Sequence, residues 1–151
     1  MKITILTIGK RHEPWVEPGI KRFLERLRAP FVAEMIITIP HSGQIGDRAR
    51  QDESERLMSR LKPHDFIILL DERGRNLSSP ELSRLILDHT DQHIVIIIGG
   101  AYGVTETLHR RADIVWSLSR LVFPHQLVRL ILAEQLYRAQ EIARGGAYHH
   151  D

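Results

Sequence analysis

Two short runs in the sequence contain only apolar residues, and they restrict the fold more than any other feature. One is FIILL, inside residues 65–71, and the other is IVIII at residues 94–98. A strand with one buried face alternates apolar and polar residues, whereas a continuous apolar run is typical of a parallel strand buried on both faces. Helices must then cover each side of the sheet. The two runs therefore predict an α/β protein with a mostly parallel sheet flanked by helices.

The rest of the chain alternates strand and helix patterns, as such a sheet requires. Pro40 stops one strand, Asp47 and Ser79 are suited to cap helices, and Pro80 fits a first helical turn. We find no internal repeat, linker or low-complexity segment and predict one domain over residues 1–151. The expected strands cover residues 2–9, 31–40, 65–71, 94–98 and 113–119, and the expected helices cover residues 14–28, 47–61, 80–88, 106–111 and 124–144.

The last expected helix, residues 124–144, is apolar over a wider arc than a helix needs to dock on one sheet. A stripe this broad should pack on a second side as well, and a second copy of the chain is the simplest partner. We therefore expect a homodimer. The apolar positions are Leu127, Leu130, Ile131, Leu132, Ala133, Leu136, Tyr137, Ala139, Ile142 and Ala143.

Composition excludes several classes of function. The sequence contains no cysteine, which rules out disulfides, zinc knuckles, iron–sulfur clusters and a cysteine nucleophile, and which fits a reducing compartment. No apolar run has membrane-spanning length, and the first residues lack the pattern of a secretion signal. The spacing of His89 and His93 invites a metal hypothesis, but they span a helix end and a loop. We expect a cytoplasmic protein without membrane association and without metal.

Positive charge is unevenly distributed. Residues 1–62 carry 12 Lys and Arg against 8 Asp and Glu, whereas residues 63–114 carry 5 against 8. A basic N-terminal part can follow a phosphate backbone, so a nucleic-acid partner is one interpretation. A solvated helix face explains the same charges equally well, and charge alone leaves both open.

A glycine-rich loop follows the second apolar run, in HIVIIIGGAYGV at residues 93–104. Ligands of open α/β sheets bind beyond the carboxyl ends of the strands, which is where Gly99, Gly100 and Gly103 fall. The dinucleotide pattern GxGxxG fails because its first glycine falls on Ile98, and no Walker lysine motif occurs. A ligand held by backbone groups and apolar walls remains open, as does a tight turn that binds nothing.

Three segments carry a family resemblance: LLDERGRNLSSPEL at residues 69–82, IIIGGAYGV at residues 96–104, and SLSRLVFPHQLVRLILAEQLYRAQEIARGGAYHH at residues 117–150. They resemble the small single-domain SPOUT methyltransferases of the RlmH type, over essentially the whole chain. The resemblance implies a SPOUT-type fold with a C-terminal trefoil knot, S-adenosylmethionine (SAM) as cofactor, and a homodimer. The implied reaction is methylation of N3 of a pseudouridine in a stem-loop of 23S (large-subunit) rRNA on assembled ribosomes.

The resemblance also implies which residues bind the cofactor. Relatives often have threonine in place of Val122, so we expect only backbone contacts there. They often have Arg or Lys in place of His150, and a histidine, which titrates near neutrality, would make RNA binding pH-dependent. The implied cofactor-binding residues are Leu70, Gly99, Gly103, Leu118, Ser119, Arg120, Leu121, Val122 and Phe123.

Methyl transfer to a ring nitrogen requires alignment of the methyl group and removal of the N3 proton. We predict His149 as the base, Arg138 or His125 as groups that stabilise the developing anion, and Tyr148 as a stacking or hydrogen-bonding partner of the target base. An ordinary helical ion pair with Glu134, four residues earlier, explains Arg138 equally well. Attack through nitrogen needs no cysteine.

Two other functions remain open: a SPOUT methyltransferase that acts on tRNA, and a non-catalytic ribosome-associated RNA-binding module. The lack of an appended RNA-binding domain favours the ribosome, where a preassembled surface supplies docking, and the glycine loop favours an enzyme. Lys10, Arg11 and the arginines of ERLMSR and RGR are candidate phosphate contacts, which position RNA without reading its sequence.

Overall fold

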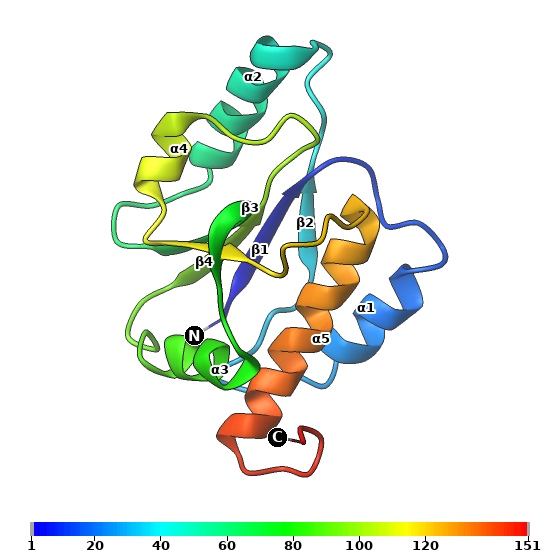
Figure 1. Ribbon diagram of the computed structural model, residues 1–151, viewed down its shortest axis with the longest axis vertical. Coiled ribbons are helices and arrows are strands. Elements are labelled where there is room, and N and C mark those ends of the chain that lie inside the picture. Colours follow the sequence, from blue (N-terminus) through cyan, green and yellow to red (C-terminus); the bar gives the residue numbers. More distant parts are fainter. Residues whose placement is uncertain (1, 151) are drawn as a thin grey trace.

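The computed structural model describes residues 2–150, and its five strands form one sheet (Figure 1). The strand order is β2-β1-β4-β3-β5, and every neighbouring pair is parallel. The prediction of an α/β protein with a parallel sheet flanked by helices is confirmed. The strands are β1 (Thr4–Ile8), β2 (Ile36–Ile39), β3 (Phe66–Asn76), β4 (Ile94–Ile98) and β5 (Ile114–Ser117); the helices are α1 (Glu17–Leu24), α2 (Gly46–Met58), α3 (Ser79–Leu87), α4 (Glu106–Arg111) and α5 (His125–Ala143).

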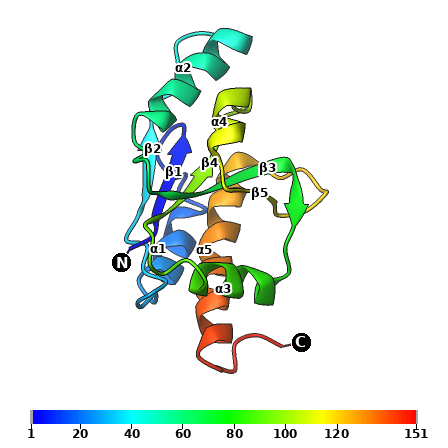
Figure 2. The same ribbon diagram turned by 90° about the vertical axis from the view of Figure 1, so that its left-hand side faces the viewer.

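Helices cover both faces of the sheet, and the central strand β4 shows why its sequence is continuously apolar. Ile94, Ile96 and Ile98 belong to one hydrophobic core, with residues of α1, α3 and α5. Val95 and Ile97 belong to a second core on the opposite face, with residues of α2 and α4. The two helical layers are visible on either side of the sheet in Figure 2. Because successive side chains of a strand point to opposite faces, every position of β4 must be apolar.

Strand β3 is longer than the predicted strand at residues 65–71, because it continues through charged residues to Asn76. After an irregularity, its last two residues pair with the last two residues of β5. A Cβ atom at Gly74 would lie 2.5 Å from the carbonyl oxygen of Val115, so the two backbones approach to a separation that only glycine permits. Pairing with a distant strand keeps this segment extended, and its own composition does not indicate a strand.

The N-cap positions of two helices, α2 and α3, lie one or two residues before the capping residues predicted from the sequence. Ser78, and not Ser79, caps α3: its hydroxyl accepts a hydrogen bond from the backbone N–H of Glu81, and the Glu81 carboxylate accepts one from the backbone N–H of Ser78. This reciprocal arrangement is a capping box. Asp47 lies inside the first turn of α2, which begins at Gly46 without a side-chain cap. There its negative charge still interacts favourably with the positive end of the helix dipole.

None of the helices formed by residues 2–150 combines the length and the apolar character needed to cross a membrane. Over the same residues there is no group of three or more histidine and carboxylate side chains placed to hold a metal ion. His89 and His93 are engaged separately. His89 stacks on Phe66, whereas His93 contacts Asp65 and Thr4.

Candidate active site

A cavity of about 830 Å³ lies at the carboxyl ends of β3, β4 and β5. One strand segment and two loops form its walls: residues 71–73 within β3, residues 99–104 after β4, and residues 118–119 and 121–123 after β5. His125 and Val128, at the start of α5, close one side. This edge of the sheet is where open α/β proteins bind their ligands.

The glycines after β4 allow the loop to pack tightly around the cavity. A Cβ atom at Gly99 would lie 2.9 Å from Cγ1 of Val104, and one at Gly100 would lie 2.6 Å from Oε1 of the buried Glu53. Gly103 has φ +75°, and its N–H donates to the carbonyl of Gly100 at 3.0 Å. The loop is therefore both a tight turn and a wall of the cavity, so the two interpretations of its glycines do not exclude each other.

His125 fixes the position of this loop. Its Nε2–H donates a hydrogen bond to the carbonyl oxygen of Gly99 at 2.6 Å. Burial, helped by the nearby Arg129 guanidinium, lowers the pKa of His125 below 6.5, against the opposing effect of the Gly99 carbonyl. A neutral imidazole with its Nε2 proton committed to Gly99 holds the loop in place and presents its other nitrogen as an acceptor.

Acid should destabilise the protein partly through this histidine. The unfolded chain takes up a proton near pH 6.5, whereas folded His125 does so at lower pH, so the free energy of unfolding falls as the pH drops below about 6.5. In the variant His125→Gln the side chain can still donate to Gly99 but does not titrate. We expect it to lose less stability than the wild type between pH 7 and pH 5 in urea unfolding. Equal losses in both proteins would contradict the assignment.

Asp71, at the end of the apolar part of β3, ties this wall to α4. Its carboxylate accepts hydrogen bonds from the backbone N–H of Arg73 at 2.8 Å and from Nε2 of His109 at 2.9 Å. Burial acts to raise the pKa of Asp71, but the donors from Arg73 and His109 outweigh it, and the pKa is lowered. The ionised carboxylate also forms an ion pair with the Arg73 guanidinium, 3.3 Å away, and both residues line the cavity.

The structure places the predicted cofactor residues around this cavity with one exception. Arg120 does not line it. Arg120 instead faces a second, open hollow of about 510 Å³, together with Asn76, Leu118, Ser119 and Leu121. The predicted residues that do line the cavity are Leu70, Gly99, Gly103, Leu118, Ser119, Leu121, Val122 and Phe123.

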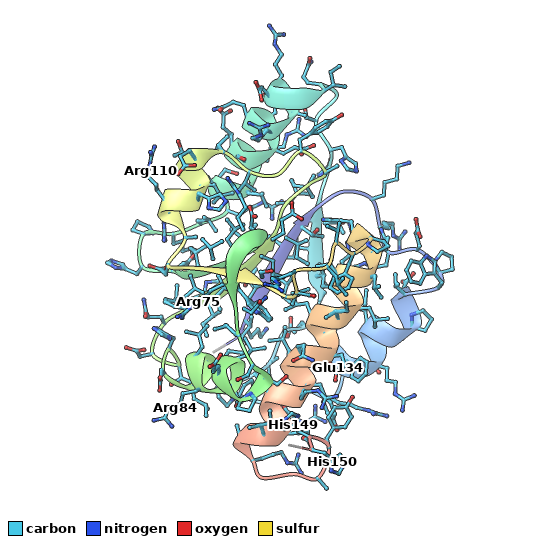
Figure 3. All side chains as sticks on the ribbon, in the orientation of Figure 1. Arg75, Arg84, Arg110, Glu134, His149 and His150 are labelled. Carbon is cyan, nitrogen blue, oxygen red and sulfur yellow. The ribbon has the colours of Figure 1, made fainter. Side chains whose placement is uncertain are left out.

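Three of the four predicted catalytic residues lie together around Glu134. Arg138 donates to Oε1 of Glu134 at 2.9 Å through Nε and at 2.7 Å through Nη2, and the Tyr148 hydroxyl donates to the same oxygen at 3.2 Å. The Arg138 guanidinium lies over the Tyr148 ring, 4.8 Å from its centroid, and its Nη1 is 3.1 Å from Nδ1 of His149. Burial and the Glu134 carboxylate raise the pKa of Tyr148. Figure 3 shows Glu134 and His149 toward the C-terminal end of α5.

The fourth predicted catalytic residue, His125, is far from this cluster. Arg138 follows His125 by thirteen residues on α5, which places them about 20 Å apart along the helix axis. The cavity lies at one end of α5, and the tail of residues 144–150 lies at the other (Figure 1). Within one chain, His149 and Tyr148 are therefore remote from the cavity.

Two features of the site are absent from the predictions made from sequence. Glu134 appeared only as a partner of Arg138, but it also accepts from Tyr148 and thereby anchors the tail. Asn76 was not predicted at all, because it reaches the second hollow only through the extension of β3. The spacing of Glu134 and Arg138 is a signal that could have drawn attention to the first feature, and no local signal exists for the second.

The α/β fold and the loop-walled cavity at the ends of its strands match a known class of enzyme. A family model described as "Predicted SPOUT methyltransferase" matches residues 1–149, so the chain belongs to the SPOUT methyltransferase family. This confirms the resemblance found in the sequence.

Several relatives match the chain over its full length, and each is named "Ribosomal RNA large subunit methyltransferase H". The chain is 39% identical to the protein of Geotalea daltonii, and the matched region covers 99% of this chain and 100% of the relative. It is 41% identical to that of Geobacter metallireducens, over 99% of both chains, and 38% identical to that of Thioalkalivibrio sulfidiphilus, over 100% of both.

Proposed function

We propose that the protein is a SAM-dependent methyltransferase that modifies N3 of a pseudouridine in a stem-loop of 23S rRNA, on assembled ribosomes in the cytoplasm. The observation that carries this proposal is the full-length similarity, at about 40% identity, to proteins named as large-subunit rRNA methyltransferases. The cavity at the ends of β3, β4 and β5 supplies the site that such an activity needs.

The residues that line the cavity fit SAM. A volume of about 830 Å³ lies in the range of small-molecule sites, and its walls combine apolar side chains with the backbone of the glycine loop. SAM carries no phosphate, which agrees with the missing Walker lysine. When bound, SAM would supply an activated methyl group for the ring nitrogen, and a base of the protein would take the N3 proton.

The residues of the tail supply the proton chemistry in this proposal. Tyr148, whose hydroxyl stays protonated, stacks on or donates to the target base. In the structure Arg138 donates to Nδ1 of His149. Because Nδ1 then accepts, the ring proton of this tautomer lies on Nε2. As RNA binds, Arg138 turns to the anion that develops on the target ring, and Nδ1 of His149 then accepts the N3 proton.

We also propose a homodimer in which the tail of one subunit completes the cavity of the other. The roughly 20 Å along α5 between His125, which lines the cavity, and Arg138, which contacts the tail, supports this arrangement. So does the outer side of α5, because Leu127 and Ile131 are only partly buried and belong to neither hydrophobic core. Val122, 80% exposed, is a further uncovered apolar side chain, and it lines the cavity.

We further propose that the chain is one SPOUT domain, residues 1–151, with a C-terminal trefoil knot. The membership of the SPOUT methyltransferase family supports the knot. So does the close pairing of the end of β3 with the end of β5, from which the chain leads into α5.

Transfer of labelled methyl groups from SAM tests the proposed substrate. Ribosomes that lack the modification, and separately transfer RNA, are incubated with the protein. We expect label in the 23S rRNA of the ribosomes and none in transfer RNA. Label only in transfer RNA would favour the tRNA methyltransferase. A protein that binds ribosomes but not SAM would favour the non-catalytic module.

A further inference from the structure

A second hollow lies directly beside the cofactor cavity. Its lining residues are Asn76 from the end of β3 and residues 118–121 after β5. Leu118, Ser119 and Leu121 line both spaces, so the hollow and the cavity share one wall. A methyl acceptor must approach the donor to about 3–3.5 Å, so an acceptor site has to adjoin the cofactor in this way.

The side chains in the hollow suit a pyrimidine base with an imide group. Asn76 donates through Nδ2 to the carbonyl of Ser117 at 3.0 Å, which leaves its own carbonyl oxygen to accept from the N1–H of a pseudouridine, so that N3 stays open to the methyl group. The Ser119 hydroxyl accepts from the backbone N–H of Leu121 at 3.0 Å and keeps its proton to donate to a ring carbonyl. Leu121, 70% exposed, offers an apolar face on which a ring can lie.

Arg120 adds a positive charge that is not neutralised within residues 2–150. Within residues 2–150, its guanidinium makes no hydrogen bond or ion pair, and the same holds for the exposed Arg75 beside Asn76. Among residues 2–150 some exposed arginines are paired, such as Arg84 with Asp88 at 3.3 Å, and others, such as Arg22 and Arg110, are not. Arg120 is set apart by its position in the lining of the hollow. An unpaired guanidinium at the edge of a hollow is suited to an external phosphate.

We propose that this hollow binds the target nucleotide of the RNA, with the base against Leu121 and the phosphate on Arg120. This inference rests on the proposed function. It assigns Arg120 to the RNA and not to the cofactor, whereas the family resemblance alone implies cofactor binding. Arg75 lies next to Asn76 on the same strand and contacts the neighbouring phosphate.

The test compares Arg120→Gln with the matched control Arg84→Gln on α3 (Figure 3). For Arg120→Gln we expect a SAM Kd within twofold of wild type by calorimetry. We also expect roughly tenfold weaker ribosome binding, with the slope of log K against log salt reduced by about one. The variant Arg120→Lys should restore most of the binding, since a phosphate accepts a point charge. Arg84→Gln should match wild type in both measurements.

A tenfold rise in the SAM Kd of Arg120→Gln with unchanged ribosome binding would overturn the proposal, as would no change in either quantity. Because ribosome binding is measured apart from turnover, the salt slope tests the hollow even if the wild-type protein transfers no methyl group. Lack of transfer by the wild type would count against the proposed function alone.

Discussion

A one-to-one mixture of a cavity variant and a tail variant should recover roughly a quarter of wild-type methyl transfer, although each variant alone is inactive. The cavity variant is Gly99→Val, in which the added side chain would collide with Val104, 2.9 Å from the Cβ position. The tail variant is His149→Gln. If the tail of one subunit serves the cavity of the other, a mixed dimer contains one site with an intact cavity and an intact tail. Half of the dimers are mixed, and each has one working site of two.

The same mixture distinguishes the alternative of a site within one chain. No chain in the mixture carries both an intact cavity and an intact tail, so such a site predicts no recovery. Gly43→Val is the matched control for the cavity variant, because no atom lies within 4 Å of its Cβ position. Size-exclusion chromatography of each variant verifies that dimers form. Mixed dimers without activity would contradict transfer between subunits.

Replacement of His149 by glutamine should lower kcat by a factor of about 10² to 10⁴, the usual contribution of a general base. The SAM Kd should stay unchanged, because in the proposed dimer His149 acts on the target base and not on the cofactor. The matched control is His150→Gln, which removes a neighbouring imidazole that is exposed. Single-turnover methyl transfer at saturating SAM measures the effect on the chemical step.

A second variant separates the role of His149 from a general loosening of the tail. Tyr148→Phe removes the hydroxyl that donates to Glu134 at 3.2 Å but retains the ring that lies under Arg138. If His149 is the base, Tyr148→Phe should reduce kcat much less than His149→Gln does and should leave its pH dependence unchanged. Equal losses in both variants would show that His149 acts only by holding the tail.

The layered fold could be predicted because its main cause is local. The five residues of β4 are apolar at every position, and only burial on both faces explains such a run. The end of β3 could not be predicted in this way. Its residues ERGRN are charged and contain glycine, and they remain extended because β5, forty residues later in the chain, pairs with them.

The candidate site could be predicted in part. The glycine loop and the residues after β5 point to a cavity at the ends of the strands, and the resemblance indicates which of them face it. The separation of His125 from Arg138 follows from helix geometry. That the tail is remote from the cavity of its own chain could be learned only from the structure, which places the cavity at the start of α5. The position of Arg120 in a separate hollow depends on Asn76, which only the long β3 brings there.

The most direct test of the central claim is nucleoside analysis of rRNA after methyl transfer. Ribosomes that lack the modification are incubated with the protein and labelled SAM, and the 23S rRNA is digested to nucleosides. We predict a single labelled product, N3-methylpseudouridine, at about one per ribosome. Label in any other nucleoside, or no label in a protein that binds SAM, would contradict the account.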